Sequence, residues 1–189
     1  MGIGAEEMIW AILGIGLGLR LISLNQRLWL DEAINVMAAK SFSFWGMVTQ
    51  YSIADFHPPG WFIILWSWGK IFGYSETSVR LPSVIFGVIK IYITYLLGKK
   101  LVSKELGLIA ALLLSVNPLH IYYSQEARMY TFAVLAVAIN VLLLAKIIKG
   151  EKVVLIFLIA SNLVILMSDY IAYFIFQDQG FSNAVYLYD

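Results

Sequence analysis

Two adjacent acids, Asp31 and Glu32, directly follow an apolar run in the segment LWLDEA, residues 28–33. A carboxylate at the boundary between water and lipid can act as a base that takes a proton from an attacking hydroxyl group. The same acids begin DEAINVMAAK, a stretch with the pattern of a short amphipathic helix. Acids at a helix N-terminus cap free amides and complement the helix dipole, a common role that needs only one of them. Taken alone, the acidic pair is better explained by helix capping than by a role as catalytic base.

The segment YYSQEARMY, residues 122–130, carries a second polar cluster, because Glu126 and Arg128 stand there between two apolar runs. Charges held at membrane depth tend to mark function, and a guanidinium can bind a phosphate through two parallel hydrogen bonds. A local ion pair among interfacial tyrosines is the alternative. Arg80, in SVRLPS, offers the same chemistry. An arginine beside a membrane helix, however, more often extends toward water.

Three further polar residues give weaker signals. His57, in FHPPGW, precedes two prolines that fix a turn, and a lone histidine is weak evidence for catalysis or a metal. Asp169 ends the fifth apolar run, where a helix-end role ranks above that of a third active-site acid. Lys90 lies inside an apolar run and is expected to extend to the interface or to pair with an acid.

The elements that must position these residues are membrane helices. The chain of 189 residues is 61% hydrophobic and only 13% charged, and its mean hydropathy is +0.82. Apolar runs of about 17 residues or more can cross a bilayer core of ~30 Å at ~1.5 Å per residue. We therefore predict an all-α polytopic transmembrane bundle that forms a single domain over residues 1–189. The expected spans are residues 8–24, 81–97, 106–123, 129–148 and 153–168, with a truncated sixth that begins at 170–176.

Composition also excludes several classes of protein. A net charge of +1 gives no reason to expect a nucleic-acid partner, and the absence of cysteine excludes disulfides and thiolate metal sites. The N-terminus holds Glu6 and Glu7 and no basic residue before Arg20, unlike a signal peptide. The first apolar run is therefore expected to remain as a membrane helix.

The lysines predict how the chain is oriented. They cluster in two loops, at 99–104 and 146–152, and the positive-inside rule places both on the cytoplasmic side. The aromatic segment 58–72 either spans the membrane or lies at its surface, and its length favours the surface. Residues 25–80 then form one long outer loop with juxtamembrane helices, on the same face as residues 124–128. We expect an integral protein of the cell membrane whose active face is extracytoplasmic.

Four motifs, in this order, carry a family resemblance: LWLDEA, FHPPGW, FGYSETSVRLPSVIFG and NPLHIYYSQEARMYTF. Over residues 28–132 the chain resembles the N-terminal part of membrane glycosyltransferases of the GT-C superfamily. It is similar to family 39 with its protein O-mannosyltransferases, to the lipid A aminoarabinose transferase, and to Rgt-type lipopolysaccharide glycosyltransferases. The motifs are specific at the level of the superfamily and weak on the sugar and the acceptor.

The resemblance implies a polyprenyl-phosphate-sugar donor and an acceptor that is a protein, lipid A or a polysaccharide. It makes Asp31 the catalytic base, with Glu32 beside it, and it places Glu126 and Arg128 near the lipid phosphate. Arg80 and Tyr123 are the further phosphate-binding candidates, and His57 and Asp169 the remaining site candidates. Some superfamily members bind a divalent cation through acids of the first and second outer loops, here Asp31 and Glu126. Others use no metal, so both alternatives stay open.

The predicted reaction is transfer of a sugar to an acceptor at the extracytoplasmic face, with inversion at the sugar carbon. A base on one outer loop and one or two arginines form the minimum set, because the leaving phosphate is already a stable anion. The alternatives are a non-catalytic component of a lipid-sugar transporter and an inactive truncated remnant. Relatives are generally longer, so a fragment, a truncated gene product and half of a split enzyme all fit, and the part missing from these 189 residues is expected to contribute to the acceptor site and the lipid groove.

Overall fold

The computed structural model describes residues 4–153 and 155–169, and within these ranges the chain is helical and contains no strand. The expected sixth span at 170–176 lies outside the described residues. The long helices are α1 (Ala5–Leu21), α6 (Glu76–Leu101), α7 (Lys104–Val116), α9 (Tyr130–Ile148) and α10 (Leu155–Ser168). The shorter elements are α2 (Leu30–Ser41), α3 (Phe44–Gly46), the π-helical turn η1 (Met47–Tyr51), α4 (Ser52–Ala54), α5 (Gly60–Phe72) and α8 (Pro118–Ser124).

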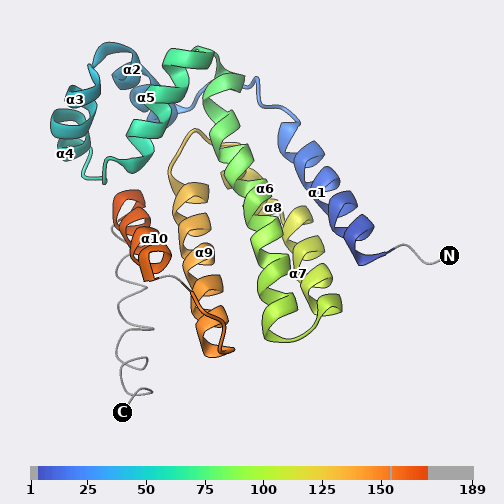
Figure 1. Cartoon of the computed structure of the whole chain (residues 1–189). Coiled ribbons are helices and arrows are strands. Elements are labelled where there is room, and N and C mark those ends of the chain that lie inside the picture. Colours follow the sequence, from blue (N-terminus) through green and yellow to red (C-terminus); the bar gives the residue numbers. More distant parts are fainter. Residues whose placement is uncertain (1–3, 154, 170–189) are drawn as a thin grey trace.

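The helices form two layers (Figure 1). Helices α1, α6, α7, α9 and α10 run roughly side by side as a bundle, while α2 to α5 gather over one end of it as a cap. The cap has its own apolar core, in which Trp61 and Phe62 of α5 pack with Met47. The same core includes Val79 of α6 and Ala127 of the α8–α9 loop, so the cap is seated directly on that end of the bundle.

Two helices, α6 and α9, are long and apolar enough to cross a membrane. The pair α7 and α8 makes a third span if the two helices are counted together, while α10 is apolar but only 14 residues long. The chain is therefore a helical protein with membrane-spanning helices. The predicted count of five spans and a sixth is not confirmed.

The expected span at 106–123 is not one straight helix, because the helix breaks at Asn117 and the chain bends there by 63°. Asn117 has an extended backbone, and its side chain accepts a hydrogen bond from the His120 N–H (2.9 Å). Pro118, the first residue of α8, cannot donate the hydrogen bond that a continuous helix needs there. This agrees with the kink or helix end that Asn117–Pro118 predicts.

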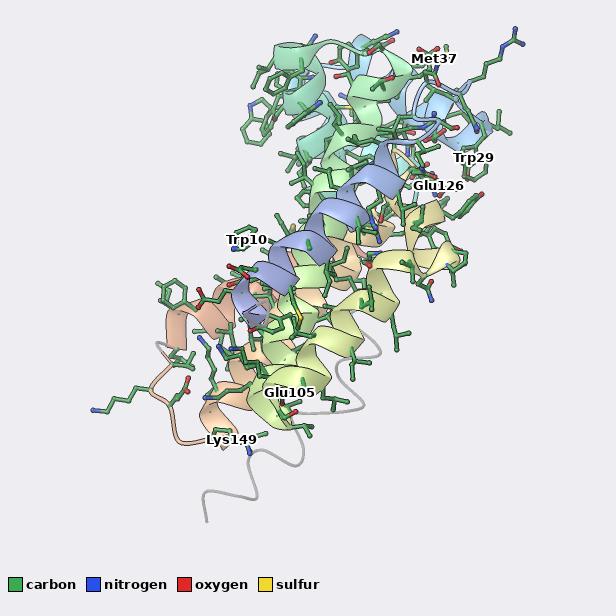
Figure 2. The ribbon with its side chains drawn as sticks, turned by 90° about the vertical axis from the view of Figure 1, so that its right-hand side faces the viewer. Trp10, Trp29, Met37, Glu105, Glu126 and Lys149 are labelled. Atoms are coloured by element: carbon green, nitrogen blue, oxygen red, sulfur yellow. The ribbon has the colours of Figure 1, made fainter. Side chains whose placement is uncertain are left out.

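The two lysine-rich loops lie at the end of the bundle opposite the cap. Figure 2 shows Glu105 and Lys149 at one end of the molecule, and Trp29, Met37 and Glu126 at the other. An ion pair between Lys100 and Glu151 joins the two lysine loops. Both loops therefore belong to one face, as the sequence predicts.

Helix α5 does not span the bundle, also as predicted. It has 13 residues and lies in the cap, with Pro59 as its N-cap. Its first residue, Gly60, touches the end of α10 so closely that an added Cβ would lie 2.3 Å from the Met167 carbonyl oxygen. A glycine is therefore needed at this contact, which brings the turn before α5 next to the C-terminal end of α10.

Candidate active site

A buried ion pair between Glu32 and Arg80 joins the cap to the bundle. Glu32 is fully buried in the first turn of α2, and Arg80 is 6% exposed on α6. The guanidinium donates to both carboxylate oxygens, at 2.9 Å from Nε and 2.6 Å from Nη2. The same carboxylate accepts hydrogen bonds from the N–H of Ala127 (2.7 Å) and of Trp29 (3.2 Å). One side chain thus holds α2, α6 and the α8–α9 loop together.

Arg80 has no donor left over for a ligand. Its five N–H groups meet Glu32 twice and the backbone carbonyls of Leu24, Gln26 and Arg27. Glu32 likewise fills both oxygens with protein donors. The two residues, expected as phosphate ligand and partner of the base, are therefore better explained as positioning residues.

The neighbouring acid, Asp31, meets the other charged loop. Its Oδ2 lies 3.7 Å from Nη1 of Arg128, which confirms that the loops at 31 and 126 meet at one face. The Asp31 side chain is 41% exposed, whereas that of Arg128 is 8% exposed. The candidate base, Asp31, is therefore open to solvent, whereas its partner Arg128 is buried.

Arg128 differs from the other two buried arginines. Arg20 is fully buried, and its guanidinium meets five acceptors: the carbonyls of Gly16, Leu114 and Ser115, the Ser124 hydroxyl and the His120 ring. In Arg80, all five N–H groups donate to Glu32 or to backbone carbonyls. Arg128 instead has a long ion pair, a buried Nε without a hydrogen-bond partner, and the Tyr130 ring at 5.7 Å. Of the three, Arg128 is the one with donors available for an anion.

Tyr51, in η1, is a further candidate residue that sequence reasoning missed. Burial raises its pKa to about 12, and the charges of Asp55, Arg128 and Asp31 all act on it. Its hydroxyl donates to Oδ1 of the buried Asn35 (2.6 Å), so it stays protonated beside the Asp31–Arg128 pair. A tyrosine in a short amphipathic segment has no spacing signature that would have revealed it.

His57 is held in the turn before α5. Its Nδ1 lies 2.9 Å from Oδ2 of Asp55 and 2.8 Å from the Asp55 carbonyl oxygen. Since Asp55 also acts on Tyr51, the Asp55–His57 pair borders the same region of the cap as Asp31. The backbone N–H of Asp169 donates to the Ile165 carbonyl oxygen (3.4 Å), at the end of α10 that contacts the start of α5.

Glu126 lines a cavity of about 210 Å³ that Glu32 and Arg80 also line. Other residues that line this cavity are Ser23, Gln26, Trp29, Tyr122 and Gln125. Glu126 is 6% exposed, and its Oε2 has no hydrogen-bond partner. Burial raises the pKa of Glu126, and the nearby Glu32 carboxylate raises it further. A hydrogen bond to Tyr122 and the charges of Arg128 and Arg80 act in the opposite direction.

We expect Glu126→Gln to become more stable relative to the unchanged chain as the pH rises. A raised pKa in the folded state means that the folded chain binds the proton more tightly, so stability is lost as pH rises past 4.5 through the folded value. Glutamine does not titrate and avoids this loss. Melting temperatures in detergent between pH 4 and 8 should therefore separate by a few degrees. A separation that is constant with pH, or that matches the exposed control Glu76→Gln, contradicts the raised pKa.

Tyr123 lies apart from the ion pair, in a second cavity, and its ring stacks on that of Tyr130 (4.9 Å between centroids, edge to face). Because Tyr130 also lies under Arg128, the link between Tyr123 and the charged loop is an indirect one. Within residues 4–153 and 155–169, no three acidic or histidine side chains gather as a metal site. Asp31 and Glu126 therefore have no third ligand of these kinds among the described residues.

Comparison with known proteins shows which family the chain matches. No curated protein and no solved structure matches the chain. A sequence model of the family described as dolichyl-phosphate-mannose-protein mannosyltransferase matches residues 56–179, well over half of the chain. This range includes Arg80, Glu126 and Arg128 and begins after Asp31 and Glu32. The match agrees with the resemblance in the motifs, and the chain belongs to the dolichyl-phosphate-mannose-protein mannosyltransferase family.

Proposed function

We propose that the chain transfers a sugar from a polyprenyl-phosphate-linked donor to an acceptor hydroxyl at the extracytoplasmic face, with inversion at the sugar carbon. The family makes it a membrane glycosyltransferase of the GT-C kind. Its description names a dolichyl-phosphate-linked mannose and a protein, so mannose and a protein hydroxyl are the first donor and acceptor to test. The positive-inside rule supports this face, since the lysine loops lie opposite the cap.

The observation that carries the proposal is the pairing of an exposed carboxylate with a buried guanidinium that has free donors. Asp31 and Arg128 are 3.7 Å apart, close enough to attract each other but longer than a good hydrogen bond. An arriving phosphate offers Arg128 shorter, charge-assisted bonds. Arg128 then turns from Asp31 to the phosphate, and the carboxylate becomes free to accept a proton.

The reaction follows from these two roles. The acceptor oxygen attacks the anomeric carbon from the side opposite the phosphate, and its proton passes to Asp31. The bond between the anomeric carbon and the phosphate oxygen breaks, and its electron pair leaves with the polyprenyl phosphate. Arg128 stabilises the negative charge that develops on that oxygen. Tyr51, kept protonated and donating its one proton to Asn35, can accept a hydrogen bond from a hydroxyl of the sugar or the acceptor.

We expect Arg128→Gln to lower sugar transfer by about 10²-fold, because a preorganised donor to developing charge is lost. Arg128→Lys keeps the charge but loses the planar fork, so a loss of about 10-fold is expected. The measurement is transfer of labelled mannose from a polyprenyl-phosphate donor, in membranes that contain the chain. Arg27→Gln removes an exposed arginine from the same end of the molecule and serves as the matched control. Equal losses in Arg27→Gln and Arg128→Gln would reduce the role of Arg128 to general attraction of anions.

A further inference from the structure

A second cavity, of about 340 Å³, lies in the bundle where α6, the α7–α8 break and the first turn of α9 meet. Four of the residues that line it are exposed, so the cavity opens sideways between α8 and α9. These exposed lining residues are Asn117 at the break and, beyond it, Leu119, Tyr123 and Val134. Its cationic and hydrogen-bonding groups come from three different helices: Lys90 from α6, His120 from α8 and Thr131 from α9.

Thr131 supplies a donor that nothing in the described residues uses. Its side chain is 3% exposed, and the hydroxyl oxygen has no hydrogen-bond partner. Leaving a buried hydroxyl unpaired costs about 1–3 kcal/mol, so such groups usually have a partner. A ligand in the cavity would provide one.

His120 supplies a second free donor, and its contact with Arg20 sets the tautomer. The His120 Nδ1 lies 2.5 Å from Nη2 of Arg20. Since a guanidinium can only donate, Nδ1 must be the acceptor, and the proton of the neutral ring is on Nε2. That Nε2 is buried and has no partner. His120 therefore presents an unpaired N–H donor at the cavity.

The first turn of α9 also lines the cavity, through Tyr130, Thr131 and Val134. Its N-cap, Met129, provides no side-chain hydrogen bond. The N–H groups that precede the first hydrogen bond of the helix, from Ala133 to the Met129 carbonyl oxygen (2.9 Å), and the positive end of the helix dipole are therefore available to an anion.

The charges near the cavity are unbalanced. Lys90 lines it, and Arg20 contacts the His120 ring. In the described part of the chain, the ion-paired carboxylates meet His57, Arg80, Lys100 and Arg128. None of them pairs with Lys90 or Arg20, so of the two alternatives expected for Lys90 the described residues do not show pairing with an acid. Among the described residues these two cations inside the helix bundle have no acid as a partner, and an anion from elsewhere would balance their charge.

We propose that this cavity is a phosphate-binding subsite, separate from the Asp31–Arg128 pair, that holds the phosphate of a membrane lipid entering between α8 and α9. Lys90 supplies the charge, and Thr131, the His120 Nε2–H and the first turn of α9 supply hydrogen bonds. The same chemistry would accept free phosphate, but the apolar side chains at the opening favour a phosphate attached to a lipid. The proposal goes beyond sugar transfer and does not depend on it.

The test is a titration of the purified chain in phosphatidylcholine nanodiscs, followed by thermal unfolding. One arm adds phosphatidic acid, and the other adds inorganic phosphate. We expect phosphatidic acid to raise the melting temperature of the unchanged chain in a saturable way. Lys90→Met and Thr131→Val should each weaken the apparent affinity by about 10-fold, since each removes a bond to a charged group. Lys70→Met, an exposed lysine at the end of α5, is the charge-matched control and should keep the full response.

The outcomes separate the sources of the phosphate. A response to inorganic phosphate alone that depends on Lys90 and Thr131 keeps the subsite but overturns the lipid as its source. No response to either probe overturns the subsite itself. The subsite is also overturned if neither Lys90→Met nor Thr131→Val weakens the response. Thr131→Val keeps the shape of the side chain, so it remains informative if Lys90→Met does not fold. Because the readout is binding, sugar transfer can fail or succeed independently.

Discussion

Asp31→Asn is expected to lower sugar transfer by about 10²- to 10⁴-fold, the range over which a positioned general base contributes. The amide keeps the size of the carboxylate and its place in the first turn of α2, but it cannot take the acceptor's proton. The Asp31 side chain is 41% exposed and has only a 3.7 Å ion pair, so the fold loses little when its charge is removed. The measurement is the rate of mannose transfer at saturating donor and acceptor.

Two comparisons make this result specific. Glu76→Gln removes an exposed acid from the first turn of α6 and should leave transfer unchanged. The melting temperature of Asp31→Asn should stay within a few degrees of that of the unchanged chain. Transfer at the normal rate by Asp31→Asn would remove this residue from the mechanism, whatever Arg128 does.

Glu32→Ala is expected to cause the largest loss of stability, about 3–5 kcal/mol in the free energy of unfolding. The carboxylate is fully buried and is the partner of Arg80. Its removal leaves the guanidinium without a counter-charge and the Ala127 N–H without an acceptor. SDS-induced unfolding of the purified chain measures the loss. Transfer activity should fall as well, but only because Asp31 and Arg128 are no longer held together.

Conservative variants distinguish this positioning role from a catalytic one. Arg80→Lys keeps the charge but cannot reproduce five fixed donors, so an intermediate loss of stability is expected. A double variant, Glu32→Met with Arg80→Met, removes both charges and should unfold less easily than Glu32→Ala. If Glu32→Ala were as stable as Asp31→Asn, the joint between cap and bundle would have to lie elsewhere.

Much of the arrangement was predictable because it follows from local rules. Helix length and hydropathy gave α6 and α9, and Asn117 with Pro118 marked the break between α7 and α8. The lysine loops fixed which turns share a face. That inference correctly brought the loop at 31 to the loop at 126, although no local pattern connects them.

The different environments of Asp31 and Glu32 were not predictable from the sequence. Both residues of LWLDEA read as candidate acids, and only the folded chain shows that Glu32 is enclosed by Arg80 and Ala127 while Asp31 stays open. The pairing of Glu32 with Arg80 joins residues 48 positions apart, so it depends on how the cap settles on α6. The position of Tyr51 and the cavity beside Lys90 depend in the same way on packing between distant helices.

The contacts of Glu32 also set an order in which the chain can assemble during synthesis. Its carboxylate can meet Arg80 as soon as α6 has been inserted, but its bond to Ala127 waits for a loop 95 residues further along. During synthesis Asp31 therefore remains without Arg128 until the ribosome has delivered the segment that precedes α9. The nascent chain would acquire the contact between Glu32 and Arg80 first and the proposed Asp31–Arg128 pair later, so the proposed centre would be complete only once α8 and the loop after it have been made.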